Sequence, residues 1–397
     1  MRQTAKMHNM MHSDSCYPVI NLTSRLYFGS FENKKETDKH LRIIYLFIED
    51  FVNYAKFSHD FGPIDISATI NYLRLVQTTL DKFNGSMVVI ASCDSSEQRL
   101  NAAVIAGAYL ILYERMPLDV VYRILTPIPV AYTTFIDASD DETAWRMDLK
   151  SALSGFAIGF QYQFFSMDTF DTFKHDSYGR VEYGDLNWIV PNKLMAFACP
   201  VTLPHVLGYA PNSTTKLAML FVHLKVSCVV QTNEFGYNPS DFTKFDIEHH
   251  HLFFPDMTPP PDEIVLKFLK LCLSCDSIAV HCKSGLGRTG SLIACYMMWK
   301  WKLPAEACIA WLRLARPGSI LTTQGHWLIH KCRSIQELTQ SDIDNNNVDK
   351  LSGPIIIAAS PLSARRVNSP IKSATITATL AAKDKKAKSK KKGLRKI

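Results

Sequence analysis

The feature that most constrains how this chain can fold is an internal repeat. Residues 88–123 contain an apolar strand, a polar loop, an apolar helix and then Pro117, which opens a second helix. Residues 278–316 repeat this order, with Pro304 opening the final helix. Proline is favoured in the first turn of a helix, so both prolines predict helix starts. The repeat therefore predicts an α/β fold of two tandem domains, each a central sheet flanked by helices.

The length of the chain agrees with two domains. At 397 residues it exceeds the roughly 250–300 residues beyond which a single core rarely grows. We predict a first domain over residues 17–165 and a second domain over residues 181–338, joined by a linker helix over residues 166–180. Residues 1–16 are predicted to be an N-terminal tail, and residues 339–397 a disordered basic tail.

The net charge of +7 is concentrated in that last segment. Residues 383–397 hold eight lysines and one arginine against Asp384, which leaves the rest of the chain close to neutral. Such a tail is either simply solvated or binds an import receptor or an anionic surface. Ser360 and Ser369, each followed by proline, are candidate sites for proline-directed kinases.

The hydrophobic segments predict a protein that stays inside the cell. No apolar run approaches the ~20 residues that a membrane span requires, and the N-terminus lacks the pattern of a signal peptide. The ten cysteines are then expected to be thiols, because the cytosol and nucleus keep them reduced.

A phosphate-binding loop is predicted between the last strand and helix of the second repeat. Cys282 and Arg288 are separated by five residues on a glycine-containing turn. Convergent backbone N–H groups and a helix N-terminus, expected near Gly290, stabilise both a phosphate dianion and a thiolate at Cys282. The predicted phosphate-binding residues are Lys283, Ser284, Gly285, Leu286, Gly287 and Arg288.

The side chains of this loop predict nucleophilic phosphoryl transfer. Arg288 presents a planar fork of donors that can hold two phosphoryl oxygens. Thr289 is expected to donate a hydrogen bond to the sulfur of Cys282, and His281 to orient the loop through backbone hydrogen bonds. Because phosphoryl transfer depends mostly on positioning and charge stabilisation, no metal or other cofactor is expected.

Two further catalytic residues are predicted outside the loop. Asp256 lies 26 residues before Cys282 in a segment whose prolines exclude a helix or a central strand. It is the predicted general acid for the leaving group. Gln324 is predicted to hold the water that hydrolyses the phosphorylated cysteine.

These residues resemble the protein tyrosine phosphatase superfamily. The wider match, from about Leu26 to about Leu328, resembles the cell division cycle fourteen family of dual-specificity phosphatases, and the run at residues 184–191 is distinctive of that family. The resemblance implies two tandem dual-specificity phosphatase folds, of which the second is catalytic and the first is a degenerate copy that helps to form a substrate groove.

The same resemblance implies a substrate class and a cellular role. It implies hydrolysis of phosphoserine and phosphothreonine, at Ser-Pro sites made by cyclin-dependent kinases, and of phosphotyrosine, through a cysteinyl-phosphate intermediate. It also implies a part in mitotic exit or cytokinesis and a nuclear and cytoplasmic location, including the nucleolus, centrosome or spindle. The expected partners are phosphorylated proteins, with no membrane and no specific nucleic acid.

In the family, acidic residues of the groove bind basic residues of the substrate. Asp137 and Asp171 match such positions, whereas Lys174 stands where another acid is expected. The family also carries consecutive glutamines in the water-positioning loop, and here Gln324 is followed by Gly325 and His326.

Other functions share this kind of loop. A phosphoinositide phosphatase, an RNA triphosphatase and a non-catalytic phosphoprotein-binding scaffold are the alternatives, of which the scaffold is disfavoured by the intact Cys282, Arg288 and Asp256. The first domain also spaces Cys93 and Arg99 by five residues. Carboxylates in that loop would repel phosphate and no glycine eases its turn, so we predict that it is inactive.

Two further groups are predicted to be structural. His249 and His251 share one face of a strand, but no other ligand cluster accompanies them, so they are expected to line the groove or the core rather than bind a metal. Cys272 and Cys275 lie in a helical pattern and are expected to pack in the core.

Overall fold

The computed structural model describes residues 15, 17–37, 42–57, 59–127, 131–139, 141–200, 213–234 and 236–352, all within one compact unit. The basic run and both Ser-Pro sites lie outside the described residues, as does the predicted N-terminal tail apart from Ser15. No helix in the described part of the chain is both long and apolar enough to cross a membrane.

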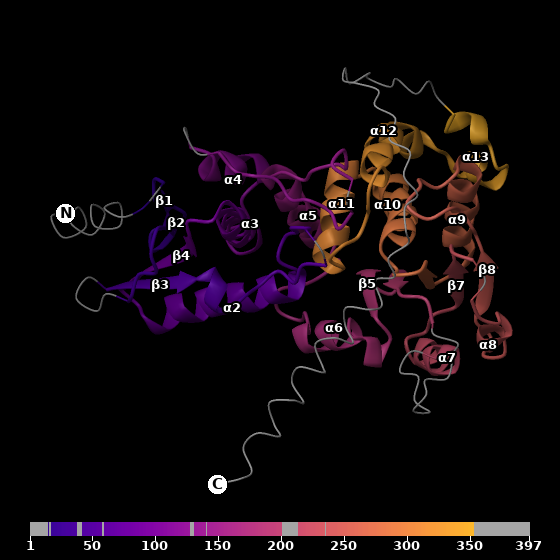
Figure 1. The fold of residues 1–397 in the computed structure, drawn as a ribbon, viewed down its shortest axis with the longest axis horizontal. Coiled ribbons are helices and arrows are strands. Elements are labelled where there is room, and N and C mark those ends of the chain that lie inside the picture. Colours follow the sequence, from indigo (N-terminus) through magenta and orange to yellow (C-terminus); the bar gives the residue numbers. More distant parts are fainter. Residues whose placement is uncertain are drawn as a thin grey trace, which may run out of the picture. The chain divides into compact units, whose positions relative to one another are not determined.

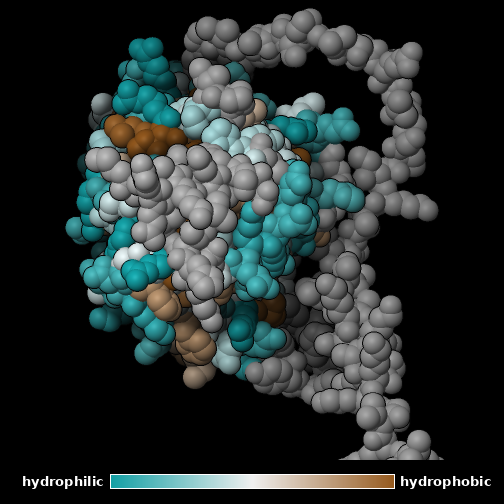
Figure 2. All heavy atoms as spheres, turned by 90° about the vertical axis from the view of Figure 1, so that its left-hand side faces the viewer, coloured by the Kyte–Doolittle hydropathy of each residue, from teal (hydrophilic) through white to brown (hydrophobic). Residues whose placement is uncertain are grey.

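A four-stranded sheet forms the centre of the first domain, in the order β1-β2-β4-β3. Its strands are β1 (Ile20–Asn21), β2 (Leu26–Phe31), β3 (Ile43–Phe47) and β4 (Met87–Cys93). Both neighbours of β4 run parallel to it. The helices are η1 (Ile48–Asp50), α2 (Ile66–Lys82), α3 (Ser96–Leu112), α4 (Leu118–Leu125) and α5 (Leu149–Gln161). The face of the molecule that lies on the left in Figure 1 is mostly hydrophilic where it is coloured, with apolar residues in small separate patches (Figure 2).

A five-stranded sheet forms the centre of the second domain, in the order β5-β6-β9-β7-β8. Its strands are β5 (Leu186–Val190), β6 (Leu194–Phe197), β7 (Cys228–Gln231), β8 (Glu248–His251) and β9 (Ile278–His281). All neighbours pair in parallel except β5, which is antiparallel to β6. The helices are α7 (Thr214–His223), α8 (Ser240–Thr243), α9 (Asp262–Ser274), α10 (Gly287–Trp301), α11 (Ala305–Ala315) and α12 (Gln324–Glu337). Between the two domains lie α6 (Thr172–Tyr178) and η2 (Val181–Tyr183).

The structure confirms the repeat and the predicted fold class. The succession β4–α3–α4 recurs as β9–α10–α11, and Pro117 and Pro304 are the N-caps of α4 and α11. Residues of β4 and β9 are buried on both faces, as expected for parallel strands covered by helices. One boundary differs from the prediction, because α10 begins at Gly287 and not near Gly290.

Helices α5 and α11 pack side by side and join the cores of the two domains (Figure 1). Gly155 and Gly159 of α5 make this approach close, since an added Cβ would lie 2.8 Å from the backbone N of Trp311 at the first position and 2.6 Å from its ring at the second. The indole of Trp311 also donates to the carbonyl oxygen of Ile189 in β5 at 2.9 Å.

The ordered part of the chain extends past the predicted end of the second domain. The prediction of a disordered tail from residue 339 is wrong for residues 339–352, which contain α13 (Gln340–Asp344) and η3 (Val348–Lys350). Ile343 and Leu351 are buried, and both helices contact α9. Two apolar side chains thus anchor a segment whose polar composition had indicated disorder.

Candidate active site

The loop after β9 has the backbone geometry of a tight anion-binding turn. Cys282 follows the strand directly and is 3 % exposed, and α10 begins five residues later. Gly285 has φ +66°, and a Cβ there would lie 2.0 Å from the carbonyl oxygen of Phe197 at the end of β6. Only glycine can therefore occupy this position in the present backbone.

Three consecutive carbonyl groups of this loop face away from its centre. The oxygen of Lys283 accepts from the N–H of Cys199 at 3.0 Å. The oxygens of Ser284 and Gly285 accept from the guanidinium of Arg316 at 3.0 and 2.9 Å. Since these carbonyls are satisfied on the outer side, the N–H groups of the turn are left to bind an anion on the inner side.

Arg316 is a residue of the site that the sequence did not single out. It is buried, donates to the Asn187 side chain at 2.8 Å and pairs with Asp185 at 2.8 Å. Both partners belong to the run at residues 184–191 that is distinctive of the resembled family. The structure gives that run a physical role, because it holds the arginine that fastens the phosphate-binding loop.

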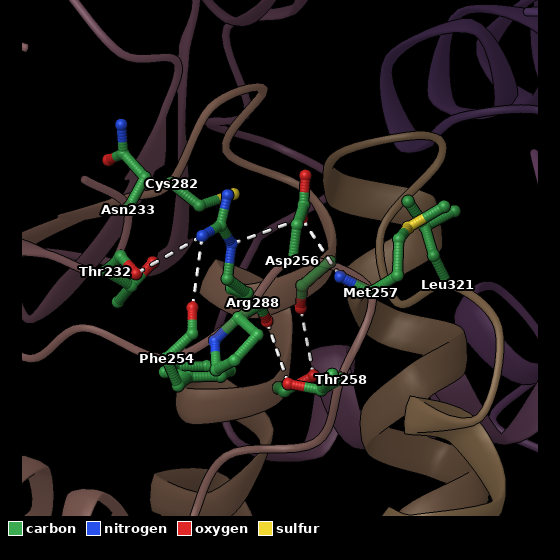
Figure 3. A network of polar contacts seen from close by, with 12 residues as sticks. Thr232, Asn233, Phe254, Asp256, Met257, Thr258, Cys282, Arg288 and Leu321 are labelled. Carbon is green, nitrogen blue, oxygen red and sulfur yellow. Dashed lines mark hydrogen bonds and ion pairs between the residues drawn. The ribbon is translucent and has the colours of Figure 1, made fainter. Parts of the chain in front are cut away.

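Arg288 lies in the first turn of α10 with its side chain 2 % exposed. One terminal nitrogen donates to the carbonyl oxygens of Phe254 at 3.1 Å and Thr232 at 3.4 Å. Its Nε lies 3.2 Å from Oδ1 of Asp256, an ion pair whose N–H is not aligned for a hydrogen bond. Figure 3 shows the guanidinium between Cys282 and Asp256. The structure therefore brings these three predicted residues together.

Asp256 lies at the surface of the site. Its side chain is 58 % exposed and accepts from the N–H of Met257 at 3.1 Å (Figure 3). Met257 has φ +60°, and Thr258 closes the turn by donating to the carbonyl oxygen of Pro255 at 2.8 Å. This carboxyl group can reach a substrate oxygen above the loop, as a general acid requires.

His281 is fully buried and linked to two other aromatic side chains. Its Nδ1 lies 3.0 Å from the carbonyl oxygen of Cys282, and its Nε2 lies 2.7 Å from the hydroxyl of Tyr237. Nδ1 must carry the proton to bond a carbonyl, so Nε2 accepts from Tyr237, whose oxygen accepts in turn from Nε2 of His249 at 2.9 Å. Burial lowers the pKa of His281 to about 3 and that of His249 to about 4, so this chain is neutral at physiological pH.

The bond predicted for Thr289 is not seen. Its hydroxyl is buried and has no hydrogen-bond partner among the described residues. The structure therefore does not show the predicted hydrogen bond from Thr289 to the sulfur of Cys282, and a role for this hydroxyl in departure of the thiolate stays a prediction.

Gln324 lies at the start of α12, fully buried against the phosphate-binding loop. Its Oε1 accepts from the N–H of Leu321 at 3.0 Å, and its Nε2 donates to the carbonyl oxygen of Thr258 at 3.0 Å. A Cβ on Gly287 would lie 2.9 Å from this Oε1. The amide thus sits between the loop that carries Asp256 and the loop that carries Cys282. Both of its polar atoms are bonded within the protein, so its part in orienting water stays a prediction.

The two predicted groove acids have different environments. Asp137 is only 6 % exposed, and its Oδ2 accepts from the N–H of Thr322 at 2.7 Å. Little of this carboxylate is open to a basic side chain of a substrate, and its place in a substrate groove stays a prediction. Asp171 is exposed, caps α6 through the N–H of Lys174 and borders a cavity of about 740 Å³. Its role in the groove stays a prediction.

In the cysteine loop of the first domain, the groups that match the phosphate-binding ones have partners within the protein. The N–H of Cys93 donates to the carboxylate of Glu49 at 2.8 Å. Burial and, to a lesser extent, the negative charge of Glu49 raise the pKa of the Cys93 thiol. Arg99 turns away, stacking 3.7 Å from the ring centre of Tyr17 and donating to the carbonyl oxygen of Ala131 at 2.7 Å. A protein carboxylate thus occupies the N–H of Cys93, which supports the prediction that this loop is inactive.

The described residues contain no group of three or more His, Cys, Asp or Glu side chains that could hold a metal ion. His249 and His251 bond to Tyr237 and to the carbonyl oxygen of Asn233. Cys272 and Cys275 are buried in the core, as predicted.

Comparisons with known proteins agree with this geometry. Residues 20–158 match the family model for the N-terminal half of dual specificity protein phosphatases, and residues 184–329 match that for a "Swiss Army Knife protein, DSP-PTPase phosphatase domain". The human dual specificity protein phosphatase CDC14A is 35 % identical over 319 residues, which cover 79 % of this chain and 53 % of that protein. Mouse CDC14B is 33 % identical over 337 residues, which cover 83 % and 68 %.

The tyrosine-protein phosphatase cdc-14 of Caenorhabditis elegans is 35 % identical over 352 residues, which cover 83 % of this chain and 50 % of the relative. The chain thus spans about half the length of the human and nematode proteins that it matches.

Proposed function

The chain belongs to the CDC14 family of dual-specificity protein phosphatases, and we propose that it hydrolyses phosphorylated proteins through Cys282. The observation that carries this proposal is the position of Arg288. A guanidinium that is 2 % exposed, held by two backbone carbonyls and paired with Asp256, is set beside the cysteine of an anion-binding turn.

The first step transfers the phosphoryl group to sulfur. The Cys282 thiolate attacks phosphorus and forms an S–P bond, while the O–P bond to the substrate breaks. Arg288 and the loop N–H groups hold the phosphoryl oxygens, and Asp256 gives its proton to the leaving oxygen.

The second step regenerates the enzyme. A water molecule oriented by Gln324 attacks phosphorus and gives a proton to the ionised Asp256, the S–P bond breaks, and inorganic phosphate leaves. The cysteine returns to its thiolate form, so protons, atoms and charge balance over the cycle.

We further propose that the chain hydrolyses phosphoserine and phosphothreonine, principally at Ser-Pro sites made by cyclin-dependent kinases, together with phosphotyrosine. We also propose that the protein acts in the cell cycle, in the nucleus and the cytoplasm, and that an import receptor binds its basic tail. Asp137 is buried and Lys174 is exposed. We therefore expect only a weak preference for a basic residue after the proline. A peptide with that residue should have a kcat/KM less than about tenfold higher than a peptide without it, because one exposed ion pair contributes little binding energy.

The test uses the full chain with a chelator present and measures phosphate release from two phosphoserine-proline peptides. One peptide has lysine three residues after the phosphoserine and the other has alanine. We expect release that Cys282→Ser abolishes and that Asp256→Asn slows by about 100-fold or more. Inositol phospholipid vesicles form the parallel arm. Release from the lipid alone would make the protein a lipid phosphatase, and no release from either substrate would favour a binding scaffold.

A further inference from the structure

We propose that the first domain positions Gln324 for the second chemical step, through Asp137, Thr143 and Trp145, which we call the buttress residues. This inference rests on the proposed function and adds a part for the domain whose own cysteine loop is degenerate. It concerns hydrolysis of the cysteinyl phosphate and not its formation.

Asp137 provides the most direct contact. Its Oδ1 accepts from the N–H and the hydroxyl of Ser139 at 3.1 and 2.6 Å, which fixes the carboxylate within its own domain. Its Oδ2 accepts from the N–H of Thr322 at 2.7 Å, two residues before Gln324. A buried, charge-assisted bond of this length is among the stronger hydrogen bonds in proteins.

The other buttress residues hold the first turn of α12. The His326 ring donates from Nε2 to the carbonyl oxygen of Thr143 at 3.0 Å. Trp145 packs on Gly325, where an added Cβ would lie 2.9 Å from the Cβ of the tryptophan. The resembled family tends to carry consecutive glutamines in this loop, whereas here Gln324 is followed by Gly325 and His326. Both of these residues contact the first domain.

The segment held in this way is strained. Ile320 and Thr322 have φ +64° and +53°, which β-branched residues rarely adopt. Such conformations are unfavourable and persist only where their surroundings enforce them. Arg313 holds the segment from α11, donating to the carbonyl oxygens of Ser319 and Ile320 at 3.1 and 3.0 Å. Asp137 holds its other end.

The strained segment also touches the loop of the general acid. The hydroxyl of Thr322 donates to the carbonyl oxygen of Met257 at 3.0 Å, and Gln324 donates to that of Thr258. Gln324 accepts from Leu321 within the segment itself. A shift of Thr322 would therefore move the amide proposed to orient water, while Cys282 and Arg288 stay fixed by β9, α10 and Arg316. Asp256 keeps its own contacts, with the N–H of Met257 and with the guanidinium of Arg288.

The test is pre-steady-state hydrolysis of p-nitrophenyl phosphate by the full chain and its Asp137→Asn variant. An asparagine has one acceptor oxygen where the carboxylate uses two, so the bond to Thr322 or the bonds to Ser139 must weaken. We expect kcat and KM to fall together by about tenfold, as when one hydrogen bond worth about 1.4 kcal/mol is lost. We expect kcat/KM to change by less than about twofold, because it reports the first chemical step. We also expect a larger burst of nitrophenolate, because phosphoenzyme accumulates when its hydrolysis is slow.

His326→Ala is a second variant for the case in which Asp137→Asn folds poorly, because it changes an exposed side chain. We expect it to lower kcat and KM together and to enlarge the burst, by smaller factors than Asp137→Asn. The matched control is Asp119→Asn, which removes a first-domain carboxylate in α4 whose described ion pair is with Lys150 of α5 and not with a buttress residue. Equal losses in kcat and kcat/KM without a larger burst, or no change, would refute the inference. A wild-type chain that releases no phosphate from any substrate would refute the proposed function instead.

Discussion

At the residue scale, the site depends on side chains that burial keeps neutral. The pKa of His281 is lowered by burial to about 3, whereas an unfolded chain would give about 6.5. Between these values the unfolded state binds more protons, so the contribution to stability is complete above about pH 6.5 and is lost as the pH falls. We expect the free energy of unfolding to drop by roughly 1.4 kcal/mol per pH unit below about pH 6 from this histidine, measured by urea unfolding.

A matched variant separates the effect of these histidines from other causes of instability at low pH. His249→Gln keeps an N–H donor for Tyr237 but removes a second group whose pKa is lowered by burial, to about 4. The variant is expected to show a shallower decline of stability between about pH 6.5 and about pH 4.5. An unchanged slope would mean that His249 is solvated and titrates normally.

The sequence predicted the catalytic residues better than the residues that hold them in place. Cys282, Arg288 and Asp256 follow from local patterns, and the structure brings them together. Arg316 and Tyr237 were missed because their partners lie far away along the chain, as Asn187 does from Arg316, 129 positions apart. Burial by a distant loop is equally invisible in one sequence, so the bond between Asp137 and Thr322 could not be foreseen.

At the element scale, a strand that meets a helix through a tight turn leaves one position for glycine alone. Gly285→Ala would place a Cβ 2.0 Å from a backbone oxygen of β6 at φ +66°. We expect the substitution to destabilise the protein by at least about 1–3 kcal/mol and to reduce phosphate release in proportion to the distortion of the loop. Thermal unfolding and kcat/KM measure the two effects.

Gly236→Ala is the control for this prediction. The nearest atom to an added Cβ there is 3.9 Å away, in Cys199, and the backbone has no positive φ. Little change is expected in either measurement. Full activity of Gly285→Ala would show that the turn can open without losing its anion site, contrary to the argument from its carbonyls.

The elements themselves were predictable for a different reason. Strand, helix and proline signals are local, and their repetition fixed the order β4–α3–α4 and β9–α10–α11 before any tertiary contact was known. Residues 339–352 were missed because only Ile343 and Leu351 are buried in a mostly polar segment. Even with the half-buried Val348, three apolar side chains in 14 residues give no periodic signal.

At the scale of the whole molecule, the sequence divides into two domains while the main hydrophobic cluster spans both. One hydrophobic cluster includes Phe156 of α5 together with Trp311 of α11. Trp311 also bonds to Ile189 of the second sheet. A core shared in this way couples the stability of the two domains, although chains of two domains often unfold in separate steps.

We therefore expect one cooperative unfolding transition, with calorimetric and van 't Hoff enthalpies that agree. Gly155→Ala would bring a Cβ within 2.8 Å of the backbone of Trp311, so it should lower the free energy of unfolding by about 1–3 kcal/mol without splitting the transition. Gly179→Ala, with 3.6 Å to the nearest atom, is the matched control. If Gly155→Ala produced two transitions, or destabilised only the first domain, the α5–α11 contact would be a docking surface between independent domains and not part of a common core.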